Sequence, residues 1–536
     1  MAISLLQVLV ASALVWAILR LRKVGSREPG LPPGPPTIPV LGNLHVFPTE
    51  YVYLKFTEWA KVYGEIYSLK IANGTAIVVN SPRLVREIFD KRSANTSDRP
   101  PMHFVSVVTD GLNVALARYG PTWRTLRRAM QQFLSREACE RHFPIQQAEA
   151  TQLMYDMLKA PDSYSLHIRR NIGSVILSTV FGIRCPRYAN SFIAQFFDGQ
   201  HQWEQLLEPG AHPPVDIIPL LKYIPAKWQV LAKDVKRKQR ALYFTLSNMV
   251  AKRMEDKKGN GCFLEELHIQ KERFNLTDDM LAYVGGACLE GGIDNSAAFL
   301  QTFVCCLTAY PEVQAKAHKE LDEVIGNQRL PSYEDLERLP YLQAIIKELE
   351  RFRPVTPLAL PHSLSADEMV EGHLLPKGAM LFMNVYALCH DEEVFDHPEV
   401  FNPDRFLNNE HGTKPGVDTS DRRLTDLGFG AGRRICPGNQ LSHQFISLAV
   451  MNLLWAFSFN HPRDPVTGKE MPVTADVTKD FTTGLVVVPK PFKSDIRPRS
   501  QAHASLIRAG YAAARPIFSQ FEHELSDADA AFVANY

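Results

Sequence analysis

The sequence lacks an excess of charge of either sign, and its cysteines show no paired spacing. Its 536 residues carry 59 Lys and Arg against 58 Asp and Glu, a formal net charge of +1. Nothing in that balance indicates the basic surface of a nucleic-acid-binding protein. The scattered cysteines are typical of reduced cytosolic thiols and argue against a disulfide framework: Cys139, Cys185, Cys262, Cys288, Cys305, Cys306, Cys389 and Cys436.

Two further features are missing from the body of the chain. It contains no linker-like segment, so we expect one large domain although length alone would suggest several. With 45% hydrophobic residues it can bury a sizeable core.

The chain also shows no flavin or nicotinamide motif of its own. Any electrons for redox chemistry would therefore come from a separate protein.

A long apolar run occurs at the N-terminus, from Ile3 to Leu19. At ~1.5 Å per helical residue it would span about 26 Å, close to the thickness of a thin bilayer. The basic residues follow the run at Arg20, Arg22 and Lys23, whereas a cleaved signal peptide carries them before it. The pattern favours an uncleaved membrane anchor over residues 1–24 with its basic flank in the cytosol. A proline-rich segment follows over residues 25–43, which we interpret as a hinge, with a disordered linker or an SH3-type ligand as the alternatives.

One cysteine lies in a glycine-rich loop, Phe429-Gly-Ala-Gly-Arg-Arg-Ile-Cys-Pro-Gly438. Glycines allow a backbone to pass close to a flat ligand, and arginines with N–H donors stabilise a thiolate. A lone cysteine in such a turn is more often structural. A helical run from Asn439 to Phe457 follows the loop.

Two other helical segments carry polar residues at meaningful spacing. Trp123 and Arg127 lie four residues apart and share a helix face. Thr277 is typical of an N-cap, and Pro311 would end the helix that begins there. That helix contains Glu290-Gly-Gly-Ile-Asp-Asn-Ser296. The two glycines predict a local opening of the helix, or else a close packing contact.

A third helical segment, Tyr341 to Arg353, places Glu348 and Arg351 three apart, where they can pair. The segments Glu65–Ile71 and Thr75–Val79 predict a β-hairpin around Asn73-Gly74.

These motifs together resemble the cytochrome P-450 family of haem-thiolate monooxygenases. Phe-Gly-x-Gly-x-Arg-x-Cys-x-Gly is matched at every fixed position, and the resemblance runs from about Leu31 to Arg497. It implies a mostly α fold with a small β-rich lobe over residues 44–498. It also implies haem b with Cys436 as axial iron ligand, and contacts to the haem from these residues: Trp123, Arg127, Phe429, Gly430, Gly432, Arg434 and Gly438.

The resemblance extends to the remaining polar motifs. Glu348, Arg351 and Arg405 correspond to the structural ion triad of the family. Asp294, Asn295 and Ser296 occupy the oxygen-activation motif and would be the catalytic residues. Asn295 replaces the usual Thr. It would either take part in the proton relay, with Asp294 as the acid, or only bond a backbone carbonyl at the glycine pair.

By family position, an apolar pocket would take a lipophilic substrate. Its lining would be drawn from the loop after the Glu348 helix, from the Met102–Leu112 segment, from the middle of the long helix and from a C-terminal turn: Val355, Thr356, Leu358, Gly291, Thr483 and Leu485. The organisation looks like fungal members that tailor secondary metabolites, such as terpenoids or polyketides, or oxidise xenobiotics.

The resemblance further implies NADPH-cytochrome P-450 reductase as electron donor, with cytochrome b5 as a second candidate, and an endoplasmic reticulum membrane location with a cytosolic catalytic domain. Two alternatives stay open: a haem-thiolate isomerase, dehydratase or peroxide-using enzyme, which Asn295 supports, and a non-catalytic haem protein. Residues 499–536 extend beyond the family fold as an Ala-rich, acidic tail of unknown role. Its Ile517, Phe518 and Phe521 are expected to pack on the body.

Overall fold

The computed structural model describes residues 16, 23–208, 213, 215–216, 219–419 and 427–536. The predicted anchor, Ile3 to Leu19, lies almost entirely outside the described residues. Within the described part, none of the helices combines the length and the apolar character that crossing a membrane requires.

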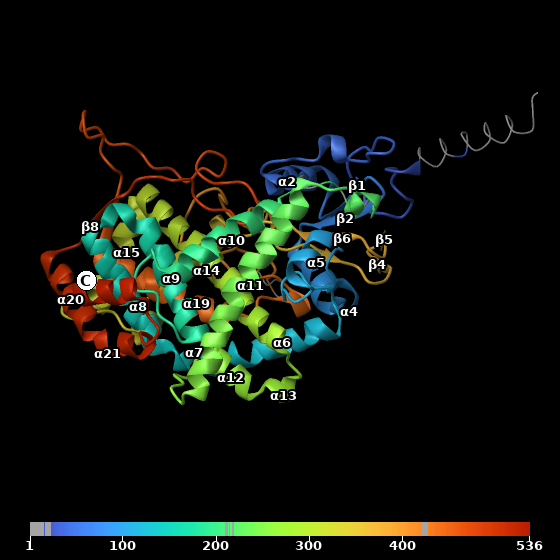
Figure 1. The fold of residues 1–536 in the computed structure, drawn as a ribbon. Coiled ribbons are helices and arrows are strands. Elements are labelled where there is room, and N and C mark those ends of the chain that lie inside the picture. Colours follow the sequence, from blue (N-terminus) through green and yellow to red (C-terminus); the bar gives the residue numbers. More distant parts are fainter. Residues whose placement is uncertain (1–15, 17–22, 209–212, 214, 217–218, 420–426) are drawn as a thin grey trace, which may run out of the picture.

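Helices form most of the chain and pack beside a small β-rich lobe (Figure 1), as predicted. The longer helices are α2 (Val52–Tyr63), α6 (Pro121–Phe133), α8 (Phe143–Lys159), α9 (Tyr164–Phe181), α10 (Ser191–Leu207), α11 (Lys227–Glu255), α14 (Asp278–Ala309), α15 (Pro311–Val324), α16 (Pro340–Phe352), α19 (Asn439–Ala456) and α20 (Gln501–Ala513). Shorter helices are α3 (Pro82–Val85), α4 (Ser93–Thr96), α5 (His103–Thr109), α7 (Arg136–Arg141), α12 (Phe263–Ile269), α13 (Lys271–Phe274), α17 (Val385–Cys389), α18 (Arg405–Asn408), α21 (Arg515–Phe518) and α22 (Asp527–Asn535).

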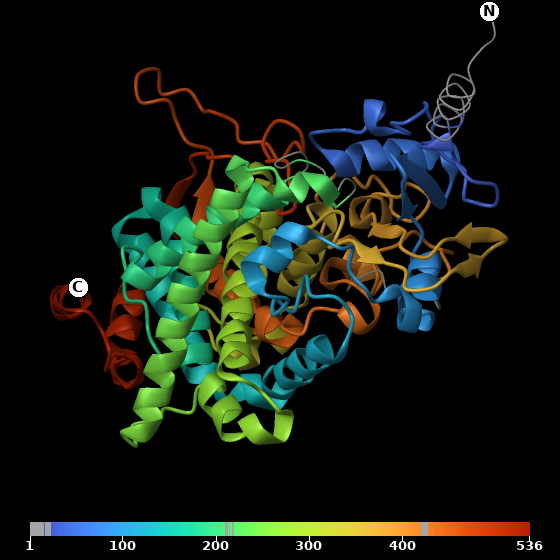
Figure 2. The same ribbon diagram turned by 45° about the vertical axis from the view of Figure 1, so that its right-hand side comes forward.

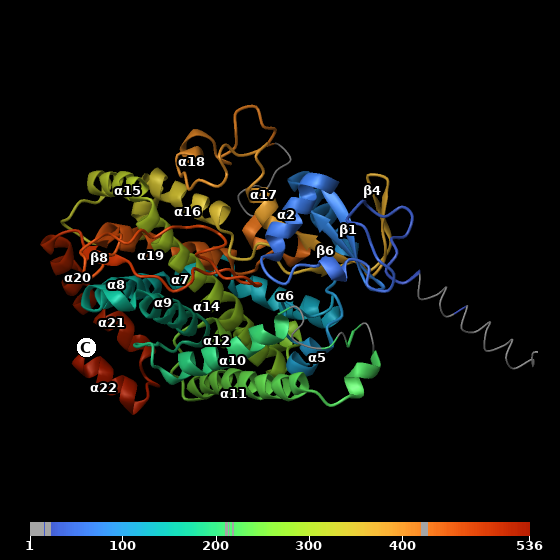
Figure 3. The same ribbon diagram turned by 90° about the horizontal axis from the view of Figure 1, so that it is seen from above.

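The β-rich lobe contains the predicted hairpin. Strands β1 (Ile66–Ile71) and β2 (Gly74–Val79) pair antiparallel, with Ile71 opposite Gly74. A four-stranded sheet continues in the order β1-β2-β6-β3 through β6 (Met380–Met383) and β3 (His362–Ser363). Two further two-stranded sheets join β4 (Glu368–Val370) to β5 (His373–Leu375) and β7 (Phe457–Asn460) to β8 (Asp495–Pro498). Figure 3 shows β1, β6 and β4 gathered at one side of the molecule, away from the C-terminal helices.

The long helix α14 crosses the interior and organises the core. Thr277 caps it by accepting a hydrogen bond from the N–H of Met280, and it ends where Pro311 opens α15, as predicted. It packs against α9, α11 and α19. The predicted local opening at the glycine pair is absent, because α14 is continuous from Asp278 to Ala309 among the described residues.

The two glycines of α14 instead serve different purposes. A Cβ on Gly292 would lie 2.8 Å from the terminal Cδ1 of Ile176 on α9, so glycine permits the close helix packing found there. A Cβ on Gly291 would meet no atom within 4 Å. The packing explanation therefore holds for Gly292, whereas Gly291 leaves open space beside the helix.

The C-terminal tail folds as helices on the outside of the helical body (Figure 2). Helix α20 packs on α8, and the rings of Tyr511 and Tyr155 stack with centroids 4.2 Å apart. Phe518 and Phe521 are buried against Ile145 and Ala148 of α8, with Ile517 beside them. The expectation that this tail packs on the body is confirmed.

Candidate active site

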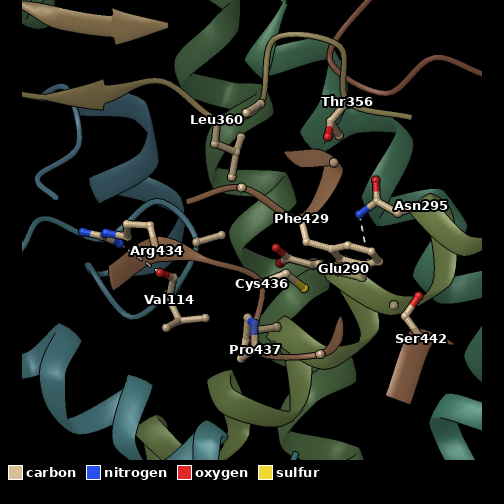
Figure 4. A pocket seen from close by; sticks show the side chains of 18 of the residues that line it. Val114, Glu290, Asn295, Thr356, Leu360, Phe429, Arg434, Cys436, Pro437 and Ser442 are labelled. Carbon is tan, nitrogen blue, oxygen red and sulfur yellow. Dashed lines mark hydrogen bonds between the residues drawn. The ribbon is translucent and has the colours of Figure 1, made fainter. Parts of the chain in front are cut away.

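Cys436 lies at the wall of an interior cavity of about 360 Å³ (Figure 4). The loop from η6 (Leu427–Phe429) to the start of α19 holds it, and its N–H donates to the Phe429 carbonyl at 2.8 Å. All eight cysteines are free thiols. Burial raises the pKa of Cys436, while a hydrogen bond from the Gly438 N–H and the charge of Arg127 act in the opposite direction.

Most of the residues predicted to contact a cofactor surround this thiol. Trp123, Arg127, Phe429, Gly430, Arg434, Cys436 and Gly438 all line the cavity. Gly432 is the exception: it lies against the backbone of Phe89, and its N–H donates to Asp90 at 2.8 Å. A Cβ there would lie 2.0 Å from the Phe89 carbonyl, so Gly432 shapes the loop, and its cofactor contact stays a prediction.

Cationic side chains converge on one end of the cavity. Arg434 donates to the carbonyls of Ser97 (2.8 Å), Val114 (3.2 Å) and Ala117 (2.8 Å). Its guanidinium lies 4.2 Å from the Trp123 ring centroid. Burial, with the nearby Arg127, lowers the pKa of Arg434 to about 9. The site therefore holds positive charge that the surrounding protein does not fully neutralise.

Arg127 is likewise not fully paired by the surrounding protein. Its Nη2 donates to the Ile435 carbonyl at 2.5 Å, but its buried Nε has no hydrogen-bond partner. Burial lowers its pKa, and the Cys436 thiol raises it. An unpartnered guanidinium donor in a buried cavity needs an acceptor, preferably an anion.

Two further residues at this end were not predicted. Arg99 donates to the carbonyls of Ala115, Leu360 and Pro361, and burial followed by repulsion from Arg434 lowers its pKa well below the usual value. His362 on β3 also lines the cavity, and its Nδ1 lies 2.8 Å from the Thr96 carbonyl. Both come from loop or strand positions with no helical spacing to the cysteine loop, so no local pattern could have indicated them.

These observations fit haem. Three arginines supply donors for the two carboxylates of its edge, the Cys436 thiol faces the same cavity, and Gly291 and Gly430 leave room for a flat ring where a Cβ would meet no atom closer than 4.0 Å.

Two of the three predicted catalytic residues of α14 line the cavity, and the third contacts a neighbouring helix. Asn295 and Ser296 line the cavity. The Asn295 amide donates to the Gly291 carbonyl at 3.0 Å, the contact expected of a purely structural role. Its Oδ1 is buried without a partner.

Asp294 is outside the set of described residues that line the cavity. It lies in hydrogen-bond contact with Glu204 of α10, and burial together with that contact raises the pKa of Glu204 to about 8.

Three of the six residues predicted for the substrate pocket line the cavity. Gly291, Val355 and Thr356 line the cavity, together with Ala359 and Leu360 from the same loop. Leu358 instead packs with the hydrophobic clusters around α2 and the main core. Thr483 is exposed and accepts a hydrogen bond from the Tyr51 N–H at 2.8 Å, and Leu485 also lies outside the cavity lining. From the Met102–Leu112 segment no described residue contributes, because the lining passes from Arg99 directly to Asn113.

The predicted ion triad is formed. Arg351 contacts Glu348 at 2.8 Å and Arg405 contacts it at 3.1 Å, with all three side chains buried. Glu348 also accepts the N–H of Asn402, and Arg351 donates to the Cys389 carbonyl. The triad joins α16 to the segment around α18.

Comparison with known proteins agrees with this site. The sequence model of the family described as Cytochrome P450 matches residues 32–492. A cytochrome P450 monooxygenase of Armillaria gallica is 45% identical over 95% of this chain and 96% of the relative. The cytochrome P450 monooxygenase yanC of Aspergillus niger is 38% identical over 97% and 99%. A zebrafish cytochrome P450 solved with abiraterone is similar in structure, with 26% identity, a TM-score of 0.67, and coverage of 84% of this chain and 100% of that one.

The chain belongs to the cytochrome P450 family, and its relatives are named monooxygenases. It is accordingly an oxidoreductase of the monooxygenase class that uses haem iron, a redox partner and a small-molecule substrate. The isomerase and dehydratase alternative is not favoured by these relatives.

Proposed function

We propose that this protein inserts one oxygen atom of O2 into a lipophilic small molecule, in fungal secondary metabolism (terpenoid or polyketide tailoring) or in xenobiotic oxidation. One observation supports this most: a single cavity is lined by the Cys436 thiol, by arginines whose charge the protein does not fully neutralise, and by apolar side chains. The apolar wall includes Ile176, Ala287, Val355, Leu360 and Phe445. Relatives from several fungi support the metabolic assignment.

Cys436 would hold the iron as thiolate, and Arg99, Arg127 and Arg434 would hold the two carboxylates of the haem edge. When bound, the haem supplies oxygen activation, and an axial thiolate favours cleavage of the O–O bond. Loss of the thiol proton would be favoured by the Gly438 N–H and the Arg127 charge, which already oppose the effect of burial.

Proton supply from the chain would start on α14. The unpartnered Oδ1 of Asn295 can accept a hydrogen bond and so hold a water in the cavity. The Ser296 hydroxyl lines the same space and can both accept and donate. Asp294 would provide the acid together with Glu204, because their contact and burial raise the pKa of Glu204 to about 8 and let the pair hold a proton that a water at Asn295 could accept.

Electrons would come from NADPH through NADPH-cytochrome P450 reductase, with cytochrome b5 as a second donor. Arg124, Arg128 and Arg433 are exposed, on α6 and on the cysteine loop, and would form the docking surface. Arg433 donates to Tyr119, and the Arg124 guanidinium lies 5.7 Å from the centroid of the same ring, so the two arginines are neighbours.

We also propose an endoplasmic reticulum location, with residues before about Lys23 as a single-pass anchor and the catalytic domain in the cytosol. The apolar run at Ile3–Leu19 and its basic flank support this. Exposed apolar side chains at Val40 and Leu41, near that flank, and at Leu220 and Tyr223 (75% and 84% exposed) would suit a membrane surface.

The test is the ferrous–CO spectrum of the purified protein. We expect the red-shifted Soret band of a thiolate ligand, and its loss in Cys436→His. Cys288→Ala is the matched control, because Cys288 lines the same cavity but burial raises its pKa to about 12. It should keep the band. A wild-type spectrum typical of histidine ligation would refute the assignment, and turnover without an electron donor would move the protein to the isomerase or peroxide-using class.

A further inference from the structure

The two polar ends of the cavity have opposite character. Arg99, Arg127 and Arg434 bring donors to one end, which suits the carboxylates of haem. Two polar groups that α14 presents are acceptors, the carboxyl of Glu290 and the unpartnered Oδ1 of Asn295, while the Ser296 hydroxyl can either accept or donate. Figure 4 shows Glu290, Asn295 and Cys436 around the same space. A ligand that satisfies the α14 wall must bring hydrogen-bond donors.

Glu290 is held in place by three neutral donors. Its Oε2 accepts from Asn113 Nδ2 at 2.6 Å, and its Oε1 accepts from Gln239 Nε2 at 3.1 Å and from the Tyr243 hydroxyl at 2.5 Å. Asn113 is itself fixed, because its Oδ1 accepts the N–H groups of Ala115 and Leu116. The carboxyl is therefore oriented before any ligand arrives, which lowers the cost of binding.

The Glu290 carboxyl can accept a further hydrogen bond. Two carboxylate oxygens accept about four hydrogen bonds, and the described structure provides three, with only one of them on Oε2. Glu290 forms no ion pair with a cationic side chain in the part of the chain that the structure describes. Burial raises its pKa, opposed by the hydrogen bonds from Tyr243 and Asn113.

The surroundings of Glu290 show that its remaining capacity faces the ligand space. The side chain is only partly covered by protein atoms, and it lines the interior cavity. A carboxyl away from bulk water is costly to keep unless its hydrogen-bonding capacity is used.

We propose that Glu290 is a specificity-determining residue that anchors the substrate by accepting a hydrogen bond from a hydroxyl group. The substrate class that follows is an otherwise apolar molecule carrying at least one hydroxyl. A neutral hydroxyl fits better than an ammonium group, because the cavity already contains three arginines and because Glu290 already accepts from a hydroxyl, that of Tyr243. This inference rests on the proposed monooxygenase function and refines its substrate.

The test compares three probes of similar shape, 2-naphthol, 2-methoxynaphthalene and 2-methylnaphthalene, in equilibrium dialysis against the haem-loaded protein. Only 2-naphthol carries a donor. A hydrogen bond to a charged group typically strengthens binding about 10- to 100-fold. We expect wild-type protein to bind 2-naphthol at least about tenfold more tightly than the other two. In Glu290→Gln this preference should fall below about threefold, with the affinity for 2-methylnaphthalene nearly unchanged.

Two further variants keep the test decisive. Glu320→Gln makes the same chemical change at a half-buried carboxyl that accepts the N–H groups of Tyr341 and Leu342 outside the cavity, and it should keep the preference. Tyr243→Phe removes one donor from Glu290 and should leave the preference equal or larger, the opposite direction to Glu290→Gln.

Absence of a preference in wild type, its persistence in Glu290→Gln, or an equal loss in Tyr243→Phe would each overturn the proposal. The ferrous–CO spectrum of every sample shows whether haem is bound through a thiolate. It therefore distinguishes failure of the hydroxyl anchor from failure of the haem assignment. Dialysis measures binding without turnover, so a normal thiolate spectrum with no preference for 2-naphthol would refute the anchor while leaving the monooxygenase function intact.

Discussion

Removal of the Phe518 ring should release the C-terminal tail from the body. Phe518 has no exposed surface, packs among Ile145, Ala148 and Phe521, and stacks 3.6 Å from the guanidinium of Arg184. Arg184 is itself buried and bound to Glu149 at 2.7 Å. A buried Phe→Ala change costs about 3–5 kcal/mol, to which the lost cation–π contact adds up to about 2 kcal/mol.

The measurable loss of stability is limited, because a tail that detaches as a unit can lose no more than its free energy of docking on the body. A loss of 3–5 kcal/mol in docking corresponds to a roughly hundred- to several-thousand-fold rise in the open population. Proteolysis follows that population when opening and closing are fast. Phe518→Ala should therefore speed cleavage within residues 499–536 by at least about a hundredfold, as measured by mass spectrometry of timed digests.

The matched control is Phe532→Ala on α22. Phe532 is only partly buried and stacks on Tyr536 with ring centroids 4.4 Å apart, so its removal should speed cleavage far less. A cleavage rate in Phe518→Ala within threefold of wild type would refute the reasoning. Equal acceleration in the two variants would show that the tail is not anchored at the Phe518 cluster.

Four other predictions follow from the contacts of named side chains. Glu348→Gln leaves Arg351 and Arg405 without their buried partner and should destabilise the protein by about 3–5 kcal/mol, with reduced haem content; an unchanged melting temperature would contradict it. Because the pKa of Glu204 is raised from 4.5 to about 8, stability should fall as pH rises between those values, and Glu204→Gln should flatten that fall in thermal unfolding at stepped pH. Asn295→Ala should increase peroxide formed per NADPH consumed at least about twofold while the haem spectrum stays intact, and equal coupling would end its relay role. First-electron transfer should slow as salt rises and slow further in Arg433→Glu, whereas a salt-independent rate would exclude charge-guided docking.

The parts of the fold that the sequence predicts well are those set by local chemistry. Thr277 and Pro311 limit α14 because a side-chain cap and a missing N–H act within one turn. The Cys436 loop and the Glu348–Arg351 pair are likewise local, since their spacing alone places the groups together. The tail helices were expected to pack because their aromatic residues have no other apolar surface to cover.

The parts that the sequence does not predict depend on contacts between distant segments. Arg99 becomes part of the cavity only because its loop packs against the loop before β3 and the cysteine loop. Thr483 was expected in the pocket, but it lies far enough away to bind the backbone of Tyr51. The environment of Glu290 is built by α11 and by Asn113, and neither contact leaves a signature in the Glu-Gly-Gly sequence.

The orientation of α14 explains why one motif supplies groups with different roles. At 3.6 residues per turn, Glu290 and Asp294 lie on one stripe of the helix, and Gly291 and Asn295 lie on the next. The first stripe meets α10 and α11, where Glu204 contacts Asp294 and Tyr243 binds Glu290. The second stripe contains the Asn295–Gly291 hydrogen bond at the cavity wall.

Glu290 on the first stripe lines the cavity, but Asp294 and its partner Glu204 lie outside the lining, so a proton shared by that pair would reach the cavity through the neighbouring stripe. Asn295 directly follows Asp294, and its unpartnered Oδ1 is the acceptor that can hold a water at that boundary. Threonine, with a shorter side chain, would place a hydroxyl there instead of an amide. Under the proposed relay, the substitution would move the proton-carrying group from the side chain to a bound water. Asp294 and Glu290 lie on the same face of α14, where contacts with α10 and α11 hold both side chains.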